Sequence, residues 1–119
     1  MRGKKPTMFK RLYTGDDGQS HLEDLDLEGA AVPNWKDLHN GAGIMFRSTS
    51  PDAPVTWHVA PRKQYCITLS GQVEIGLGDG SKHYFGPGDV MLAEDLTGQG
   101  HTTRAVGPEP RVVAYVPVD

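Results

Sequence analysis

His58, Gln64 and His101 are the residues whose types and spacing best suit chemistry in this chain of 119 residues. They fall in three short segments of extended character, and the side chains of a strand alternate between two faces. If the strands close around one interior, the three side chains converge on a single point. Two imidazoles and an oxygen form an acceptable coordination sphere for a transition metal, with positions left open for water or substrate.

Acidic residues ahead of the second histidine offer a chemistry that needs no metal. Glu94 and Asp95 are expected on a loop before His101. A carboxylate next to an imidazole in a partly dry cavity fixes the tautomer of the ring and raises its strength as a base. We therefore expect a general acid or base among His101, His58 and Glu94.

Candidate ligand-binding residues flank these groups. Arg62 and Arg104 lie near the two histidine segments, and a guanidinium can hold a substrate carboxylate through a planar, two-pronged contact. A position on the surface is the alternative for both arginines. Gln64 and Asp95 complete the expected ligand-binding set. Cys66 lies in an apolar run without an adjacent base, so we expect it to be a small buried hydrophobic residue.

The elements that position these residues are predicted to be short strands. The 15 glycines and 9 prolines fall between short apolar runs, an arrangement typical of an all-β chain with frequent turns. No run has helical periodicity of any length. Extended segments are expected at residues 8–13 and 21–28, and they are followed by eight predicted strands at residues 44–48, 55–59, 63–69, 73–77, 82–85, 90–93, 101–106 and 111–116.

A chain of this length is expected to form one domain with a core that needs no disulfide or metal to fold. Within it, residues 1–42 are expected to form an N-terminal arm, strand and loop that pack on a β-barrel formed by residues 43–119. Trp35 is expected to hold the loop at residues 30–42 against the barrel. Asp79-Gly80 predicts a tight hairpin turn between two of the strands.

The spacing of His58, Ala60, Gln64 and Gly71 resembles the first sequence motif of the cupin superfamily, in which the corresponding residues are His, His, Glu and Gly. The segment at residues 88–101, which begins Gly-Asp and ends Gly-x-x-His, resembles the second cupin motif with two extra residues. The resemblance covers about residues 43–116. It implies a cupin-like antiparallel β-barrel, of the double-stranded β-helix or jelly-roll type, with a small-molecule pocket in its mouth.

The resemblance also implies a metal site at His58, Gln64 and His101, as in metal-dependent cupins. Two positions depart from the motif, because Ala60 has no donor atom and the neutral amide of Gln64 stands in place of a carboxylate. The loss of one ligand and one charge weakens metal binding by several orders of magnitude. One divalent transition metal (Fe, Mn, Ni or Zn) and a metal-free pocket with hydrogen-bonded histidines therefore both stay open.

Charge and composition argue against some classes of partner. The formal net charge is -3, with acidic and basic residues interspersed, which is not the pattern of a protein that binds nucleic acid or an anionic membrane. One cysteine rules out an internal disulfide framework, and the basic N-terminus is not followed by the apolar stretch of a secretory signal. We expect a cytoplasmic protein that binds a small organic ligand.

Apolar residues in excess of one barrel interior predict a homodimer. Tyr65, Ile67 and Leu69 point away from Gln64 in their strand, and the final strand is apolar on both sides. The N-terminal segment, a second subunit or both are needed to cover this surface. We expect the strand at residues 8–13 to lie across the partner and pair with an exposed sheet edge.

Two classes of function follow. The first is a cupin-family small-molecule enzyme of the isomerase, lyase or dioxygenase type, in which His101 acts as acid or base or a weakly bound metal acts as Lewis acid. The second is a non-catalytic module that binds or senses a small ligand, since fold alone does not imply function. Convergent polar and titratable groups inside the barrel favour the enzyme, and an apolar interior with only the two histidines favours the binding module.

Overall fold

The computed structural model describes residues 8–25 and 40–119, and these residues form strands and no helix. The all-β class predicted from the sequence is therefore confirmed. Within the described ranges there is accordingly no helix long and apolar enough to span a bilayer. The strands are β1 (Phe9–Thr14), β2 (Ser20–Asp24), β3 (Met45–Thr49), β4 (Gln64–Ser70), β5 (Gln72–Gly76), β6 (Lys82–Phe85), β7 (Val90–Glu94), β8 (Thr102–Val106) and β9 (Arg111–Pro117).

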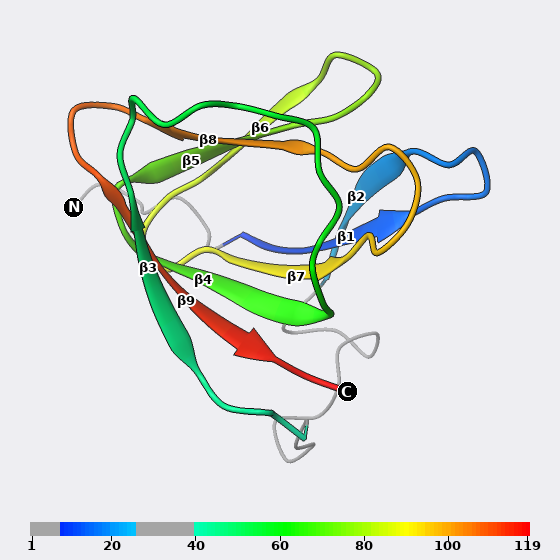
Figure 1. Ribbon diagram of the computed structural model, residues 1–119, viewed down its shortest axis with the longest axis horizontal. Coiled ribbons are helices and arrows are strands. Elements are labelled where there is room, and N and C mark those ends of the chain that lie inside the picture. Colours follow the sequence, from blue (N-terminus) through cyan, green and yellow to red (C-terminus); the bar gives the residue numbers. More distant parts are fainter. Residues whose placement is uncertain (1–7, 26–39) are drawn as a thin grey trace, which may run out of the picture.

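The strands form two sheets. The larger has the order β2-β1-β7-β4-β9-β3 and the smaller the order β6-β5-β8. Figure 1 shows the smaller sheet lying across the larger one, so that the inner faces of the two sheets enclose the interior of the molecule. The alternating apolar residues on the two inner faces meet between the sheets and form the core.

Two features differ from the expected closed, antiparallel barrel. The described strands remain two separate sheets, neither of which closes on itself, and β1 pairs with β7 in parallel. The parallel pair begins at the turn before β7, where the Asp89 carboxylate accepts a hydrogen bond from the backbone N–H of Met8 at 2.9 Å. The N–H of Val90 in turn donates to the carbonyl of Met8 at 2.9 Å. These contacts bring the start of β1 to the start of β7.

The N-terminal segment is part of the larger sheet. Strand β1 is hydrogen-bonded to β2 on one edge and to β7 on the other. Residues 8–25 are therefore paired within the larger sheet, and β1 has no free edge with which to lie across a partner. The expected loop at residues 30–42 falls largely on residues 26–39, including Trp35, which are outside the described ranges.

Seven of the eight strands predicted after residue 43 are present within one residue or so of their expected bounds. The exception is the run at residues 55–59, which makes one isolated bridge, between His58 and His101. Pro54 and Pro61 bound this run, and proline has no N–H to donate to a sheet. The carbonyl of Thr56 is engaged by the His58 side chain, at 3.0 Å from Nδ1. Residues 55–59 therefore form a largely exposed, irregular segment and not a strand.

Candidate functional site

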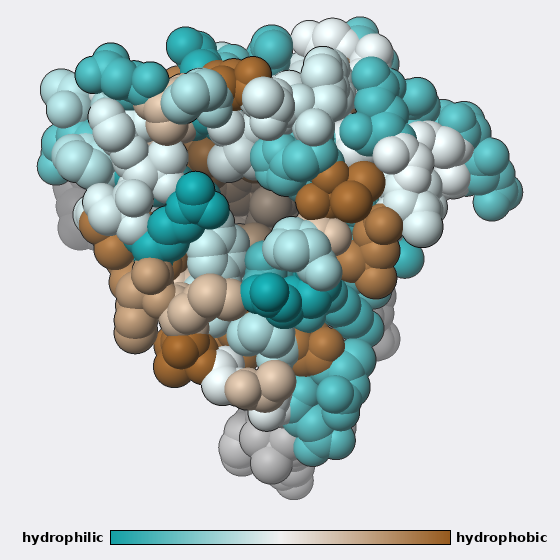
Figure 2. All heavy atoms as spheres, viewed as in Figure 1, coloured by the Kyte–Doolittle hydropathy of each residue, from teal (hydrophilic) through white to brown (hydrophobic). Residues whose placement is uncertain are grey.

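A cavity of about 550 Å³ lies between the two sheets. Figure 2 shows the molecule hollowed at the centre of the face viewed in Figure 1, with strongly hydrophilic residues beside the hollow. Four of the seven expected catalytic and ligand-binding residues line the cavity together, although they come from separate segments of the chain: His58, Arg62, Gln64 and His101.

His101 is the polar residue of the cavity with the most elaborate hydrogen bonding. Its Nδ1 lies 2.6 Å from Oδ2 of Asp95, and both side chains are buried. The hydroxyl of Ser20 donates to the same carboxylate oxygen at 2.6 Å. A carboxylate that accepts the Nδ1 proton leaves Nε2 of the neutral ring as the proton acceptor. The Ser20–Asp95–His101 chain therefore fixes the tautomer in which His101 can act as a base.

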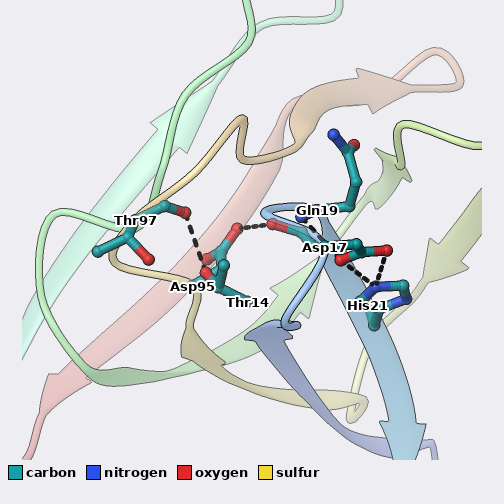
Figure 3. Close-up of polar contacts among 7 residues, drawn as sticks. Thr14, Asp17, Gln19, His21, Asp95 and Thr97 are labelled. Atoms are coloured by element: carbon teal, nitrogen blue, oxygen red, sulfur yellow. Dashed lines mark hydrogen bonds and ion pairs between the residues drawn. The ribbon is translucent and has the colours of Figure 1, made fainter.

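The hairpin of β1 and β2 holds the Asp95 carboxylate in place. Ser20 is the first residue of β2, and Asp95 follows the last residue of β7. Figure 3 shows this hairpin against the segment that continues from Asp95. Thr14 Oγ1 donates to the carbonyl of Thr97 at 2.9 Å, and Gln99 N–H donates to the carbonyl of Gly18 at 3.0 Å. The hairpin thus supplies the Ser20 hydroxyl, which donates a hydrogen bond to Asp95, and the contacts that position the segment leading to His101.

His58 lies opposite His101 across the isolated bridge. Each backbone N–H of the pair donates to the carbonyl of the other, at 3.0 and 2.9 Å, and the ring centroids are 4.6 Å apart with an interplanar angle of 59°. His58 is exposed, whereas His101 is buried. Nδ1 of His58 is hydrogen-bonded to the carbonyl of Thr56, and Nδ1 of His101 is hydrogen-bonded to Asp95. In both rings Nε2 is therefore the nitrogen available to a ligand. The two rings therefore lie side by side in the cavity wall, with the exposed His58 ring toward the mouth and the buried His101 ring toward the interior.

Gln64 and Cys66 lie on the inner face of β4. Gln64 is buried, and its Oε1 has no hydrogen-bond partner among the described residues. It is therefore an acceptor available to a ligand, because an unsatisfied buried carbonyl is costly. Burial raises the pKa of the Cys66 thiol to about 12. Cys66 stays protonated near neutral pH, which agrees with the interpretation of this residue as a small buried hydrophobic side chain.

Arg111 is a residue of the cavity that the sequence analysis missed. It is the first residue of β9, is only 4% exposed, and donates through Nη2 to Thr68 Oγ1 at 3.2 Å. Its Nε has no partner among the described residues. Arg111 shares one face of the strand with Val113 and Tyr115 by alternation, but the other face is apolar as well. The sequence therefore did not show which of the two faces lies inside.

Three of the expected site residues lie outside the cavity: Glu94 and Asp95, contrary to the expectation from the sequence, and Arg104, which takes the alternative position on the surface. Ala93 of β7 lines the cavity, so Glu94 points to the other face, where it pairs with Arg11 at 2.6 Å and Lys63 at 3.5 Å. Arg104 is likewise on the outer face of β8 and pairs with Glu74 of β5 at 2.8 Å. Asp95 is fully buried behind His101, and so orients that ring without reaching a ligand.

The donor set suggested by the cupin resemblance does not fit a divalent metal well. His58, Gln64 and His101 line the cavity, but all three are neutral donors, and Ala60 beside them offers none. Within the described residues, no three His, Cys, Asp or Glu side chains come together as a metal site. The buried guanidinium of Arg111 also places a positive charge in the same cavity. A cation here would meet repulsion without a carboxylate to offset it.

Comparison of the sequence with protein-family models and with curated proteins finds no match for this chain.

Proposed function

We propose that this chain is a cupin-like small-molecule enzyme of the isomerase or lyase type, in which His101 is the general acid–base group. The observation that supports this most directly is the 2.6 Å contact between His101 Nδ1 and the fully buried Asp95 carboxylate. A buried carboxylate stabilises the imidazolium that forms when Nε2 takes a proton. This is the arrangement of a base that gains and returns a proton during a reaction cycle.

The chemical step is proton transfer at a carbon next to a carbonyl or carboxylate group. Nε2 of His101 removes the proton, and the electron pair of the C–H bond moves into the adjacent carbonyl. Return of the proton from Nε2 to a different carbon, with the double bond shifted, completes an isomerisation. Departure of a leaving group from the neighbouring carbon with its bonding pair completes an elimination, and both routes need no redox partner.

Several features support the cupin-like assignment and the enzyme over a passive binding module. Two sheets face one another, and the segments of the two motif histidines meet at their bridge. The cavity contains convergent polar and titratable groups beyond the two histidines, namely Gln64, Thr103, Arg111 and Tyr115. An interior built only to hold an apolar ligand has no need for a buried imidazole with its own carboxylate.

Exchange of carbon-bound protons with D2O, followed by proton NMR, tests the proposal. A set of small ketones, aldehydes and carboxylic acids is incubated with the wild-type chain, and with His101→Gln, which keeps a polar side chain of similar reach. We expect exchange into at least one compound, and a rate about 10²–10⁴-fold lower in the variant. The Glu94→Gln variant, altered on the outer face, serves as the control and should keep the wild-type rate.

A wild-type chain that binds members of the set yet exchanges no proton would favour the binding module over the enzyme. Exchange that persists unchanged in His101→Gln would remove His101 from the reaction. Folding of both variants is checked by circular dichroism before the rates are compared.

A further inference from the structure

The charges that line the cavity have one sign. Among the described residues that line it, three are arginines, at positions 47, 62 and 111, and none is aspartate or glutamate. Arg47 and Arg62 are exposed, so water and salt screen them. Arg111 is 4% exposed, so its charge acts in a medium of much lower polarity.

Arg111 lacks an acidic partner among the described residues. Its hydrogen bond to Thr68 Oγ1 and its contact with Tyr115 involve neutral hydroxyl groups, and Nε has no partner. Burial lowers the pKa of this guanidinium from its usual high value, as expected of a cation without a counterion. Arginine nevertheless remains charged at neutral pH. Buried charges in folded proteins are normally paired, so the missing anion points to a ligand.

The amide oxygen of Gln64 sets a second requirement for the ligand, because it is buried without a hydrogen-bond partner among the described residues. Gln64 of β4 and Arg111 of β9 lie on the inner faces of adjacent strands of one sheet, and both line the cavity. Gln64 pairs with Pro117 at the other end of β9 from Arg111, and the Arg111 side chain reaches toward it as far as Thr68. Oε1 accepts hydrogen bonds and cannot donate one. A ligand that satisfies both residues therefore carries an anionic group and, separately, a hydroxyl or amino donor.

We propose that the cavity binds a small hydroxy- or amino-carboxylate, with its carboxylate on Arg111 and its hydroxyl or amino group directed to Gln64 Oε1. A carboxylate is favoured over a phosphate because the buried guanidinium of Arg111 matches two coplanar oxygens, whereas a phosphate dianion would have to draw on Arg47 and Arg62, which are exposed. The inference rests on the proposed function for the reaction, since it names the substrate class for His101, but the binding it describes does not depend on turnover.

Ligand-observed NMR and calorimetry on the full chain test the inference. The probe set consists of small hydroxy- and amino-carboxylates, each matched with its primary amide, together with phosphate monoesters of the same carbon skeletons. We expect carboxylates to bind and their amides to bind at least about tenfold more weakly. Arg111→Met should lose the preference for carboxylates, and should remain folded because a buried apolar side chain replaces an unpaired charge.

Arg104→Gln is the matched control, since it removes an arginine that is paired with Glu74 outside the cavity. It should bind the carboxylates like the wild type. Equal binding of carboxylates and amides, preferred binding of the phosphate monoesters, an equal loss in Arg104→Gln, or no carboxylate bound at millimolar concentration would each overturn the inference. Carboxylates that bind through Arg111 but exchange no proton in D2O would instead refute the proposed reaction and leave the ligand class intact.

Discussion

At the scale of the residue, the chemistry of the cavity depends on which buried polar atoms have partners. Asp95 Oδ2 accepts two hydrogen bonds of 2.6 Å, from Ser20 and His101, so this carboxylate is held firmly behind the ring. Gln64 Oε1, Arg111 Nε and the other Asp95 oxygen, Oδ1, are buried without such partners among the described residues. The Asp95 contacts fix the geometry of the base, and Gln64 and Arg111 are residues that line the cavity.

The Cys66 thiol provides a prediction about pH. Its pKa is raised by burial from 9.0 to about 12, so the folded chain keeps the thiol proton in a range where the unfolded chain loses it. This contribution to stability is fully present below pH 9.0 and is lost as the pH rises toward about 12. The free energy of unfolding, measured in urea, should therefore fall more steeply above about pH 9 in the wild type than in Cys66→Ala.

The same burial predicts slow alkylation. Iodoacetamide at about pH 8 should modify Cys66 only at the rate at which the chain unfolds, and urea should accelerate the reaction. Rapid modification of the native protein would show that the thiol is accessible and that the two pH profiles need not differ.

At the scale of the element, the segment at residues 95–100 decides where His101 lies. It leaves β7 of the larger sheet at Asp95, follows the β1–β2 hairpin and reaches β8 of the smaller sheet through the His58–His101 bridge. Gly100 adopts a φ of +81°, and a Cβ at this position would overlap the carbonyl oxygen of His58. That carbonyl accepts the N–H of His101. A side chain at position 100 therefore cannot be accommodated without breaking the bridge.

Gly100→Ala should lower the free energy of unfolding by more than about 3 kcal/mol, because backbone strain and the clash with His58 add together. Gly107→Ala is a close control, since Gly107 has a φ of +88° but a Cβ added there would have no atom within 4 Å. It should cost only about 1–2 kcal/mol, the strain alone. Urea denaturation of the two variants measures the difference, and equal losses would mean that the bridge is not constrained by Gly100.

At the scale of the whole molecule, β3 is one of the two edge strands of the larger sheet in the described part of the chain, and it is exposed. Ile44, Met45 and Phe46 at this edge are 59%, 43% and 66% exposed. An apolar strand edge with unpaired backbone groups favours pairing with another chain. We propose that two copies of the chain pair here, in place of the exchange of N-terminal arms expected from the sequence, because both edges of β1 are occupied.

Light scattering coupled to size exclusion tests the dimer. The wild type should be dimeric at micromolar concentration, and Ile44→Lys should shift it to the monomer by placing a charge at the strand edge without altering a residue of the cavity. Tyr84→Lys, on β6 of the other sheet and 43% exposed, should leave the dimer intact. A monomeric wild type, or a Tyr84 variant that dissociates equally, would contradict the interface.

Most strands could be predicted from the sequence alone, together with four of the polar residues that line the cavity: His58, Arg62, Gln64 and His101. Alternation of apolar and polar residues and the glycine and proline breaks are local signals, so they locate β3 to β9 and place Gln64 and Cys66 on one face. The two motif histidines, His58 and His101, were also identified from the sequence, and both line the cavity. Glu94 and Arg104 were expected in the pocket because each is close in sequence to His101. The alternation of side chains along β7 and β8 instead turns both of them outward.

The pairings between residues far apart in the chain could not be predicted from the sequence. Ser20 and Asp95 are 75 residues apart, and only the parallel pairing of β1 with β7 brings the hairpin to the carboxylate. The burial of Arg111 without a counterion depends on which strands surround it, and no local pattern states that. Sheet order and register are set by the packing of whole faces, so the partners of each buried polar atom follow from the fold and not from its neighbours in the chain.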